Sequence, residues 1–159
     1  MASRVYVETT VPSAYVTTRT DPSSLHRREV TRAWWDDQLA RYDVWVSEAV
    51  VLELEQGDWP AKAEALRLVE PLRRVPVTEE VVNVSRRLVQ ERLVPVNLAG
   101  DALHLAIACV YEFDFLLTWN VRHLANPNKL AHLIVVNRRL GLLTPQIVTP
   151  ETLWLEADT

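Results

Sequence analysis

The chain has 159 residues, of which 48% are hydrophobic and 24% charged, and this is enough for one domain, residues 1–159, around one core. No apolar run approaches the roughly 18 to 20 residues of a membrane span, and Met1-Ala2-Ser3-Arg4 leads straight into a strand-like segment. We therefore expect a cytoplasmic protein without a membrane partner. The net charge of -4 argues against a protein that coats nucleic acid through its overall field, but it does not exclude a nuclease.

Short runs rich in valine and aromatic residues alternate with longer helical patterns, which is typical of an α/β fold with a mostly parallel sheet. In the first half we predict, in chain order, a strand at 4–7, a helix capped by Thr10, a helix starting at Asp21-Pro22, a strand at 44–46 and a helix capped by Ser47. In the second half we predict helices at 61–73 and 79–91, with an edge strand at 75–77 between them. A buried helix after Gly100, a strand at 115–118, a helix at 129–140 and a last strand at 147–148 follow. The prediction is a central sheet of four to five strands flanked by helices.

The side chains that soft metals prefer are scarce. Cys109 is the only cysteine and lies in the most apolar stretch, so we interpret it as core filling. The four histidines show neither HExxH nor zinc-finger spacing. Carboxylate chemistry with hard ions such as Mg2+ or Mn2+ therefore remains the main candidate.

Acidic residues occupy positions where a soluble protein normally places apolar ones. Glu8 ends the run Val5-Tyr6-Val7, Glu53 interrupts an apolar helix, and Asp101 opens the most apolar helix of the chain. Burying carboxylates without a partner costs several kcal/mol each, so their convergence predicts raised pKa values, matched arginines or a bound metal.

The coarse topology favours the metal. Ligands collect at the carboxyl ends of the strands in an open α/β sheet, and Glu8, Asp101 and Asn120 are all assigned to that end, with Glu53 reaching in from one flank. A divalent ion between the carboxylates would offset their repulsion, polarise a phosphate and activate water. The structural alternative is that each acid caps a helix or pairs with a base, as Asp101 does if it only caps its helix.

Four segments resemble the ordered motifs of PIN domains, especially the VapC-like toxins of type II toxin-antitoxin systems. They are VYVETTVPS at 5–13, SEAVVLE at 47–53 closed by Gly57, GDALHLA at 100–106 and LLTWN at 116–120. The resemblance covers nearly the whole chain. It implies a PIN-like three-layer fold and a Mg2+- or Mn2+-dependent endoribonuclease, usually dimeric, that a co-expressed antitoxin inhibits.

The resemblance also implies roles for individual residues. Glu8, Glu53 and Asp101 match the metal-binding acids, and Asn120 falls where many members have a fourth acid. Glu8 stands in place of the more usual aspartate, and Asn120 keeps an oxygen ligand while removing a charge. We therefore expect one ion to bind well and a second only together with substrate phosphate. Thr10 and Thr118 match the small hydroxyl residues that typically line such sites in this family.

Further side chains have less specific expectations. His104 lies one helical turn after Asp101, so we expect it either to donate to Asp101 or to be a satisfied core histidine. Paired arginines at 27–28, 73–74, 86–87 and 138–139 can hold phosphates or serve as solvated ion pairs. Apolar surface around Trp34-Trp35 and over 140–148 predicts a homodimer.

The leading hypothesis is thus hydrolysis of RNA by a metal-dependent ribonuclease, with an antitoxin as its protein partner. The alternative is a catalytically weakened PIN-like module that acts as an RNA- or protein-binding scaffold. A receiver-like phosphoacceptor domain is disfavoured because Glu8 is followed by two threonines and neither Lys62 nor Lys129 is at the end of a late strand.

Overall fold

A computed structural model describes residues 1–95 and 99–156 of the chain. Its sheet contains β1 (Arg4–Val7), β2 (Asp43–Ser47), β3 (Arg73–Val75), β4 (Phe115–Leu117) and β5 (Gln146–Val148). The strand order is β3-β2-β1-β4-β5, and each neighbouring pair is parallel. The predicted α/β fold with a parallel sheet is confirmed.

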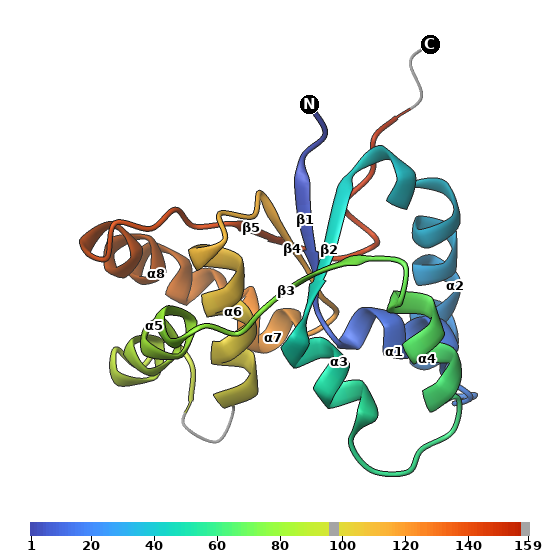
Figure 1. Cartoon of the computed structure of the whole chain (residues 1–159). Helices are drawn as coiled ribbons and strands as arrows, with labels where there is room; N and C mark the ends of the chain where they lie inside the picture. Colours follow the sequence, from blue (N-terminus) through green and yellow to red (C-terminus); the bar gives the residue numbers. More distant parts are fainter. Residues whose placement is uncertain (96–98, 157–159) are drawn as a thin grey trace.

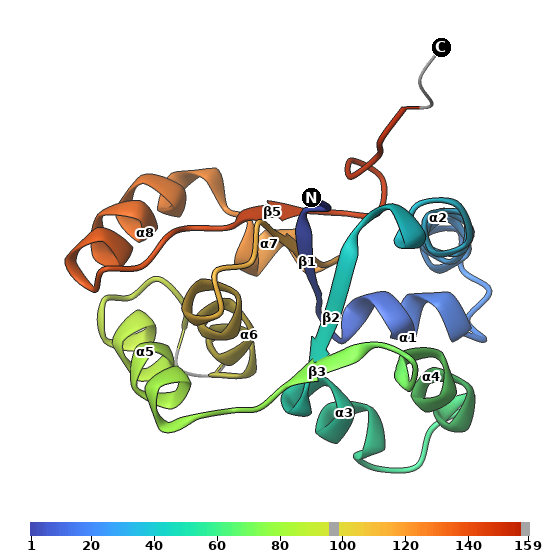
Figure 2. The same ribbon diagram turned by 45° about the horizontal axis from the view of Figure 1, so that its top comes forward.

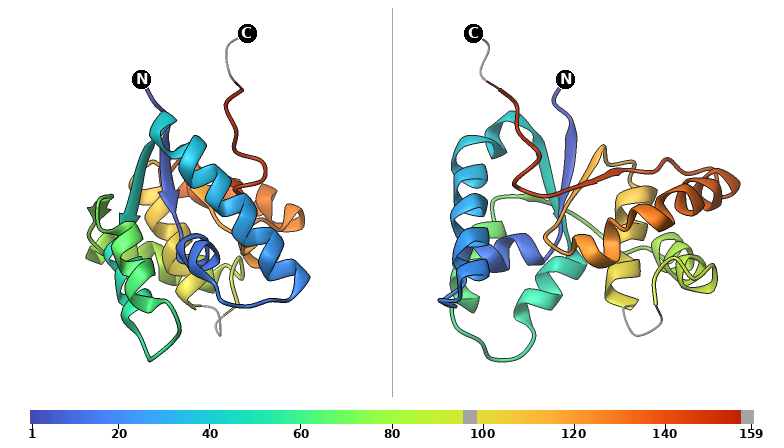
Figure 3. Two further views of the ribbon diagram at one scale, coloured as in Figure 1. Left: turned by 90° about the vertical axis from the view of Figure 1, so that its right-hand side faces the viewer. Right: turned by 180° about the vertical axis from the view of Figure 1, so that it is seen from behind.

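Helices cover both faces of this sheet (Figures 1 and 2). The first half of the chain contributes α1 (Thr10–Val16), α2 (Pro22–Asp37), the 3-10 turn η1 (Leu39–Arg41), α3 (Glu48–Glu55) and α4 (Lys62–Val69). The second half contributes α5 (Glu79–Gln90), α6 (Ala99–Val110), α7 (Val121–Leu124) and α8 (Pro127–Arg139). In Figure 3, α1, α2 and α4 lie on one side of the sheet, and α5, α6 and α8 lie on the other.

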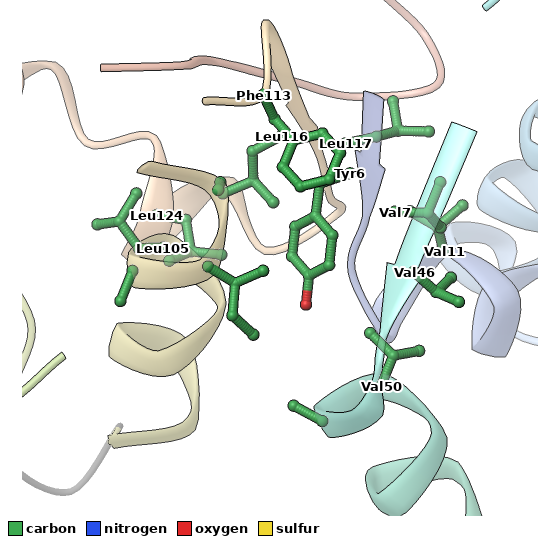
Figure 4. Close-up of a cluster of buried hydrophobic side chains, with 14 of the residues drawn as sticks. Tyr6, Val7, Val11, Val46, Val50, Leu105, Phe113, Leu116, Leu117 and Leu124 are labelled. Carbon is green, nitrogen blue, oxygen red and sulfur yellow. The ribbon is translucent and has the colours of Figure 1, made fainter. Parts of the chain in front are cut away.

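The core surrounds β1, where Val5, Tyr6 and Val7 are all fully buried. Because β1 is central and covered on both faces, it is a continuous apolar run rather than an alternating one. Figure 4 shows Val7 among valines of α1, β2 and α3, whereas Tyr6 faces the side of Leu105 in α6. The strand order reverses next to β1. The strands β2 and β3 lie on one side of β1, and the later strands β4 and β5 lie on the other. Such a switch point is where open α/β sheets bind ligands.

Local signals place several helix ends as predicted. Asp21 and Ser47 are N-caps, with their side chains accepting hydrogen bonds from the backbone N–H groups of Ser24 and Val50. Gly57, at a φ of 69°, follows α3 in the left-handed region that glycine tolerates best.

Two predicted boundaries are wrong because of prolines. The helix predicted at 61–73 ends at Val69, since a proline at position 71 lacks an N–H and clashes with a helix continuing through it. The edge strand predicted at 75–77 is instead Arg73–Val75, which places Pro76 just beyond it. Its place at the edge of the sheet is as predicted.

Two other predictions change on tertiary grounds. Thr10 does not cap α1: it is the first helical residue, and its hydroxyl donates to Glu8 instead. Trp34 is fully buried and does not contribute to apolar surface, because the segment after β5 covers it and the Leu153 carbonyl accepts its indole N–H at 2.8 Å. No helix in the described part of the chain is both long and apolar enough to cross a membrane.

Candidate active site

Glu8, Glu53 and Asp101 line one cleft, of about 830 Å³, at the carboxyl end of the sheet. Glu8 follows β1, Glu53 lies in α3 and Asp101 lies in the first turn of α6. Residues from α1, α2 and the loop between α3 and α4 complete the lining. We call this hollow the acid cleft.

Glu8 is the most deeply buried of the acids, with 3% of its surface exposed. Its Oε1 accepts the Thr10 backbone N–H at 2.7 Å, and its Oε2 accepts the hydroxyls of Thr10 at 2.8 Å and Thr118 at 2.7 Å. Burial raises the pKa of the Glu8 carboxyl, although the charge of His104 and these hydrogen bonds oppose the rise. The hydroxyl pair that the motif comparison placed in the site therefore contacts Glu8 directly.

Glu53 is half-buried and hydrogen bonds to a histidine. Its Oε1 lies 2.8 Å from Nε2 of His104. Burial by itself would raise the pKa of Glu53, but the hydrogen bond and charge of His104 outweigh burial, so the pKa is lowered. This carboxyl is therefore held in its ionised form.

His104 was expected to contact Asp101, if it contacted an acid, and it contacts Glu53 instead. It is 2% exposed, and its other ring nitrogen, Nδ1, lies 2.6 Å from the hydroxyl of Tyr6. Burial opposes the charged imidazole, yet the hydrogen bond to Glu53 and the charges of Glu8, Glu53 and Asp101 raise its pKa overall. The influence of all three acids on one imidazole reflects how closely they gather.

Asp101 forms hydrogen bonds with Asn120, which follows β4. The Asn120 Nδ2 lies 3.0 Å from both Oδ1 and Oδ2 of Asp101. In this orientation the amide donates to the carboxylate, which differs from the expected role of Asn120 as an oxygen ligand. The amide relieves the repulsion that an acid at position 120 would create.

The described residues contain no ready-made group of three or more His, Cys, Asp or Glu side chains in metal-binding geometry. Within the same residues, no lysine or arginine forms an ion pair with Glu8, Glu53 or Asp101. Glu53 and Asp101 are only partly buried and line the cleft. The donor set is entirely oxygen from three carboxylates, which fits a hard divalent cation.

Basic and aromatic side chains also line the acid cleft. Arg27 of α2 lines the cleft and its guanidinium lies 5.4 Å from the ring centroid of Trp119. Of the paired arginines in the sequence, only Arg27 lines this cleft. Arg19 and Trp59 also line it, and neither was predicted, because no local pattern around them marks a site.

A second hollow, of about 370 Å³, lies between α7, α8 and β5. Among the described residues its lining is mostly apolar and holds His123 and Lys129 but no carboxylate. Cys109 is buried elsewhere in the core, and burial raises the pKa of its thiol to about 12, which agrees with core filling and disfavours a thiolate.

Comparison with known proteins identifies the fold. The chain is similar to the crystal structure of VapBC2 from Rickettsia felis bound to a DNA fragment from their promoter, at 13% identity and a TM-score of 0.51, over 92% of this chain and 98% of that one. It is also similar to VapC20 from Mycobacterium tuberculosis, described as a sarcin-ricin loop cleaving toxin, at 16% identity and a TM-score of 0.56, over 76% of this chain and 93% of that one. No protein-family model and no curated protein sequence matches the chain. The chain thus has the VapC-like PIN fold that its motifs predicted.

Proposed function

We propose that the protein is a Mg2+- or Mn2+-dependent endoribonuclease and the toxin of a type II toxin-antitoxin pair. The observation behind this proposal is that Glu8, Glu53 and Asp101, from distant parts of the chain, converge in one cleft. Among the residues that the structure describes, none of the three has a lysine or arginine partner. The similarity of the fold to VapC20, which is described as cleaving the sarcin-ricin loop, supports the same assignment.

The three carboxylates would hold the ion. When bound, a divalent ion supplies charge stabilisation at a scissile phosphate and an activated water for its hydrolysis. Thr10 and Thr118 orient Glu8, His104 orients Glu53, and Asn120 orients Asp101. Each acid thus has a hydrogen-bond donor, other than a lysine or an arginine, that fixes its direction.

Arg19 and Arg27 would bind the backbone of the RNA. Both are exposed and both line the acid cleft, so they can reach phosphates without leaving buried partners unpaired. They lie on the α1 and α2 side, whereas the acids come from β1, α3 and α6. The cleft therefore has one wall for phosphate binding and one for hydrolysis.

The chemistry is tested by RNA cleavage with Mn2+ and with Asp101→Asn, which preserves shape and removes one charge. We expect Asp101→Asn to lose roughly 100-fold or more in kcat, because loss of an orienting partner alone costs ten to a hundredfold at metal sites. Asp36→Asn, the same change at an exposed position in α2 outside the cleft, is the control and should keep full activity. Equal cleavage by all three proteins would rule out the assignment.

A scaffold without catalysis is the second candidate, and the geometry of two residues favours it. Glu8 already accepts hydrogen bonds from three donors, and Asn120 turns its amide nitrogen toward Asp101. A metal that binds only the native state at a hundred times its Kd stabilises by about 2.7 kcal/mol, so Mn2+ should raise the melting temperature. No shift with millimolar Mn2+ would favour the scaffold over the nuclease.

We further propose a homodimer and a cognate antitoxin as partners. Leu130, Val135, Leu140 and Leu143, in α8 and the segment after it, have between 38% and 69% of their surface exposed. Exposed apolar side chains of this kind mark association surfaces. Light scattering at micromolar concentration should give twice the chain mass, and a monomer mass would contradict the dimer. An antitoxin tail in the acid cleft should abolish cleavage.

A further inference from the structure

Three buried polar side chains form a continuous line of hydrogen bonds behind the acid cleft. The Tyr6 hydroxyl lies 2.8 Å from Oγ of Ser47 and 2.6 Å from Nδ1 of His104, whose Nε2 lies 2.8 Å from Oε1 of Glu53. Tyr6 and Ser47 are fully buried and His104 is 2% exposed. We call Ser47, Tyr6 and His104 the polar chain.

The partners give the polar chain a direction. A Glu53 carboxylate only accepts, so Nε2 of His104 must carry the proton between them. With a neutral ring, Nδ1 accepts the Tyr6 proton, and the Ser47 hydroxyl donates to Tyr6 while its oxygen accepts the Val50 N–H. With a charged ring the bonds between His104, Tyr6 and Ser47 reverse, but Nε2 still donates to Glu53. Each of these polar atoms has at least one hydrogen-bond partner in both cases.

The residues of the polar chain belong to, or cap, the elements that position the three acids. Tyr6 is in β1, two residues before Glu8; Ser47 caps α3, which carries Glu53; and His104 is in α6, one turn after Asp101. Figure 4 shows the Tyr6 hydroxyl directed away from Phe113, into the space between Leu105 of α6 and Val50 of α3. A single tyrosine therefore ties together the strand and the two helices that set the positions of the carboxylates.

Packing alone does not require these residues. A phenylalanine at position 6 would fill the same space, and burying polar groups costs free energy unless all of them are paired. A polar network is worth keeping in a core when it specifies one arrangement of the elements around it.

We infer that Tyr6, Ser47 and His104 are positioning residues that hold Glu53, and through β1 and α6 the other two acids, at the cleft where the divalent ion would bind. This inference rests on the proposed function. None of the three needs to touch the ion or the RNA, because they act through the carboxylates.

The test is Tyr6→Phe in the full-length protein, with Mn2+ binding measured by calorimetry and RNA cleavage measured separately. We expect the Kd for Mn2+ to rise roughly 10- to 100-fold, as for other residues that orient metal ligands. The kcat should fall while the KM for RNA stays within about twofold, because exposed arginines rather than the acids bind flanking phosphates.

Tyr111→Phe is the matched control. It removes the same hydroxyl from the residue that follows α6, where that group donates to the Pro76 carbonyl at 2.6 Å, outside the acid cleft. Its Kd for Mn2+ and its kcat should remain at the wild-type values. A second pair, His104→Gln and His104→Leu, serves if Tyr6→Phe does not fold. The glutamine keeps a donor for Glu53, so it should retain part of the Mn2+ affinity that the leucine loses.

The outcomes separate the two proposals. A Tyr6→Phe protein that is less stable but binds Mn2+ with the wild-type Kd and cleaves with the wild-type kcat would overturn the positioning role and leave the nuclease intact. Wild-type protein that neither binds Mn2+ nor cleaves RNA would overturn both.

Discussion

At the scale of single residues, His104 links the electrostatics of the site to the stability of the fold. It is buried beside Glu53 and within the field of Glu8 and Asp101, and the acids outweigh the effect of burial on its pKa. The raised pKa means that the folded state binds this proton more tightly than the unfolded chain does. Protonation of His104 therefore stabilises the metal-free protein.

The sign of the pH dependence follows from this shift. The stabilisation by His104 is fully present below its ordinary pKa of 6.5 and is lost as the pH rises through the raised value in the folded state. Urea unfolding of metal-free protein at pH values on both sides of 6.5 should show a falling free energy of unfolding. His104→Gln should flatten this dependence, and a wild-type protein that gains stability with rising pH in that interval would contradict the prediction.

Two acids of the cleft also have shifted pKa values. Glu8 has a raised pKa, so its contribution is present below its ordinary value of 4.5 and is lost as the pH rises. Glu53 has a lowered pKa, so its contribution is present above 4.5 and is lost as the pH falls. The comparison with His104→Gln is therefore needed to separate the contribution of His104 from that of Glu8, which has the same sign.

At the scale of elements, α1, α2 and the turn between them form the basic wall of the acid cleft. Arg19 lies in that turn and Arg27 lies in α2, and both side chains are exposed. Each phosphate contact releases about one counterion from the RNA, so its loss weakens binding and also lowers the dependence of binding on salt.

We therefore predict that Arg19→Ala and Arg27→Ala each weaken binding of single-stranded RNA to metal-free protein. The slope of log K against log salt should become shallower by about 0.7 for each lost contact, as expected for single strands. Fluorescence anisotropy over a range of salt concentrations measures this slope. Arg139→Ala, an exposed arginine at the end of α8 and outside the cleft, should leave it unchanged. An equal effect of all three substitutions would mean that overall charge, not the cleft, binds RNA.

At the scale of the whole molecule, the segment after β5 closes the fold onto α2. Leu153 is 6% exposed, and its carbonyl accepts the indole N–H of the buried Trp34. Gln38 makes a second contact between the same segments, because its side chain accepts the Leu155 backbone N–H at 2.8 Å. The end of the described chain therefore packs against α2 and the residue that follows it, more than a hundred positions earlier in the sequence.

This closure predicts different costs for two neighbouring leucines. Leu153→Ala should lower the free energy of unfolding by about 2 to 5 kcal/mol, as for other buried leucines. Leu155→Ala, with 48% of the wild-type side chain exposed, should stay within about 0.5 kcal/mol of wild type. Urea unfolding measures both, and equal values would show that the segment does not pack against Trp34.

Much of this molecule was predictable from short-range patterns. The first strand, the caps at Asp21 and Ser47 and the acids at strand and helix ends depend on contacts within a few residues, which the sequence displays directly. The helix predicted at 61–73 ends at Val69. Pro71 lacks the backbone N–H that a continuing helix needs, so this boundary was also predictable from the sequence.

The remaining features depend on partners that are distant in sequence. Spacing on α6 suggested Asp101 as a partner of His104, but only the packing of α3 against α6 brings Glu53 to its Nε2. In the same way, only the path of the chain after β5 decides that Trp34 is covered, and only the approach of α2 to the sheet brings Arg27 into the cleft. Which charged residues lie at the ends of which elements can be predicted from the sequence. Which of these residues contact one another depends on the tertiary structure, because side-chain contacts act over a few ångströms while the chain between the residues runs for dozens of positions.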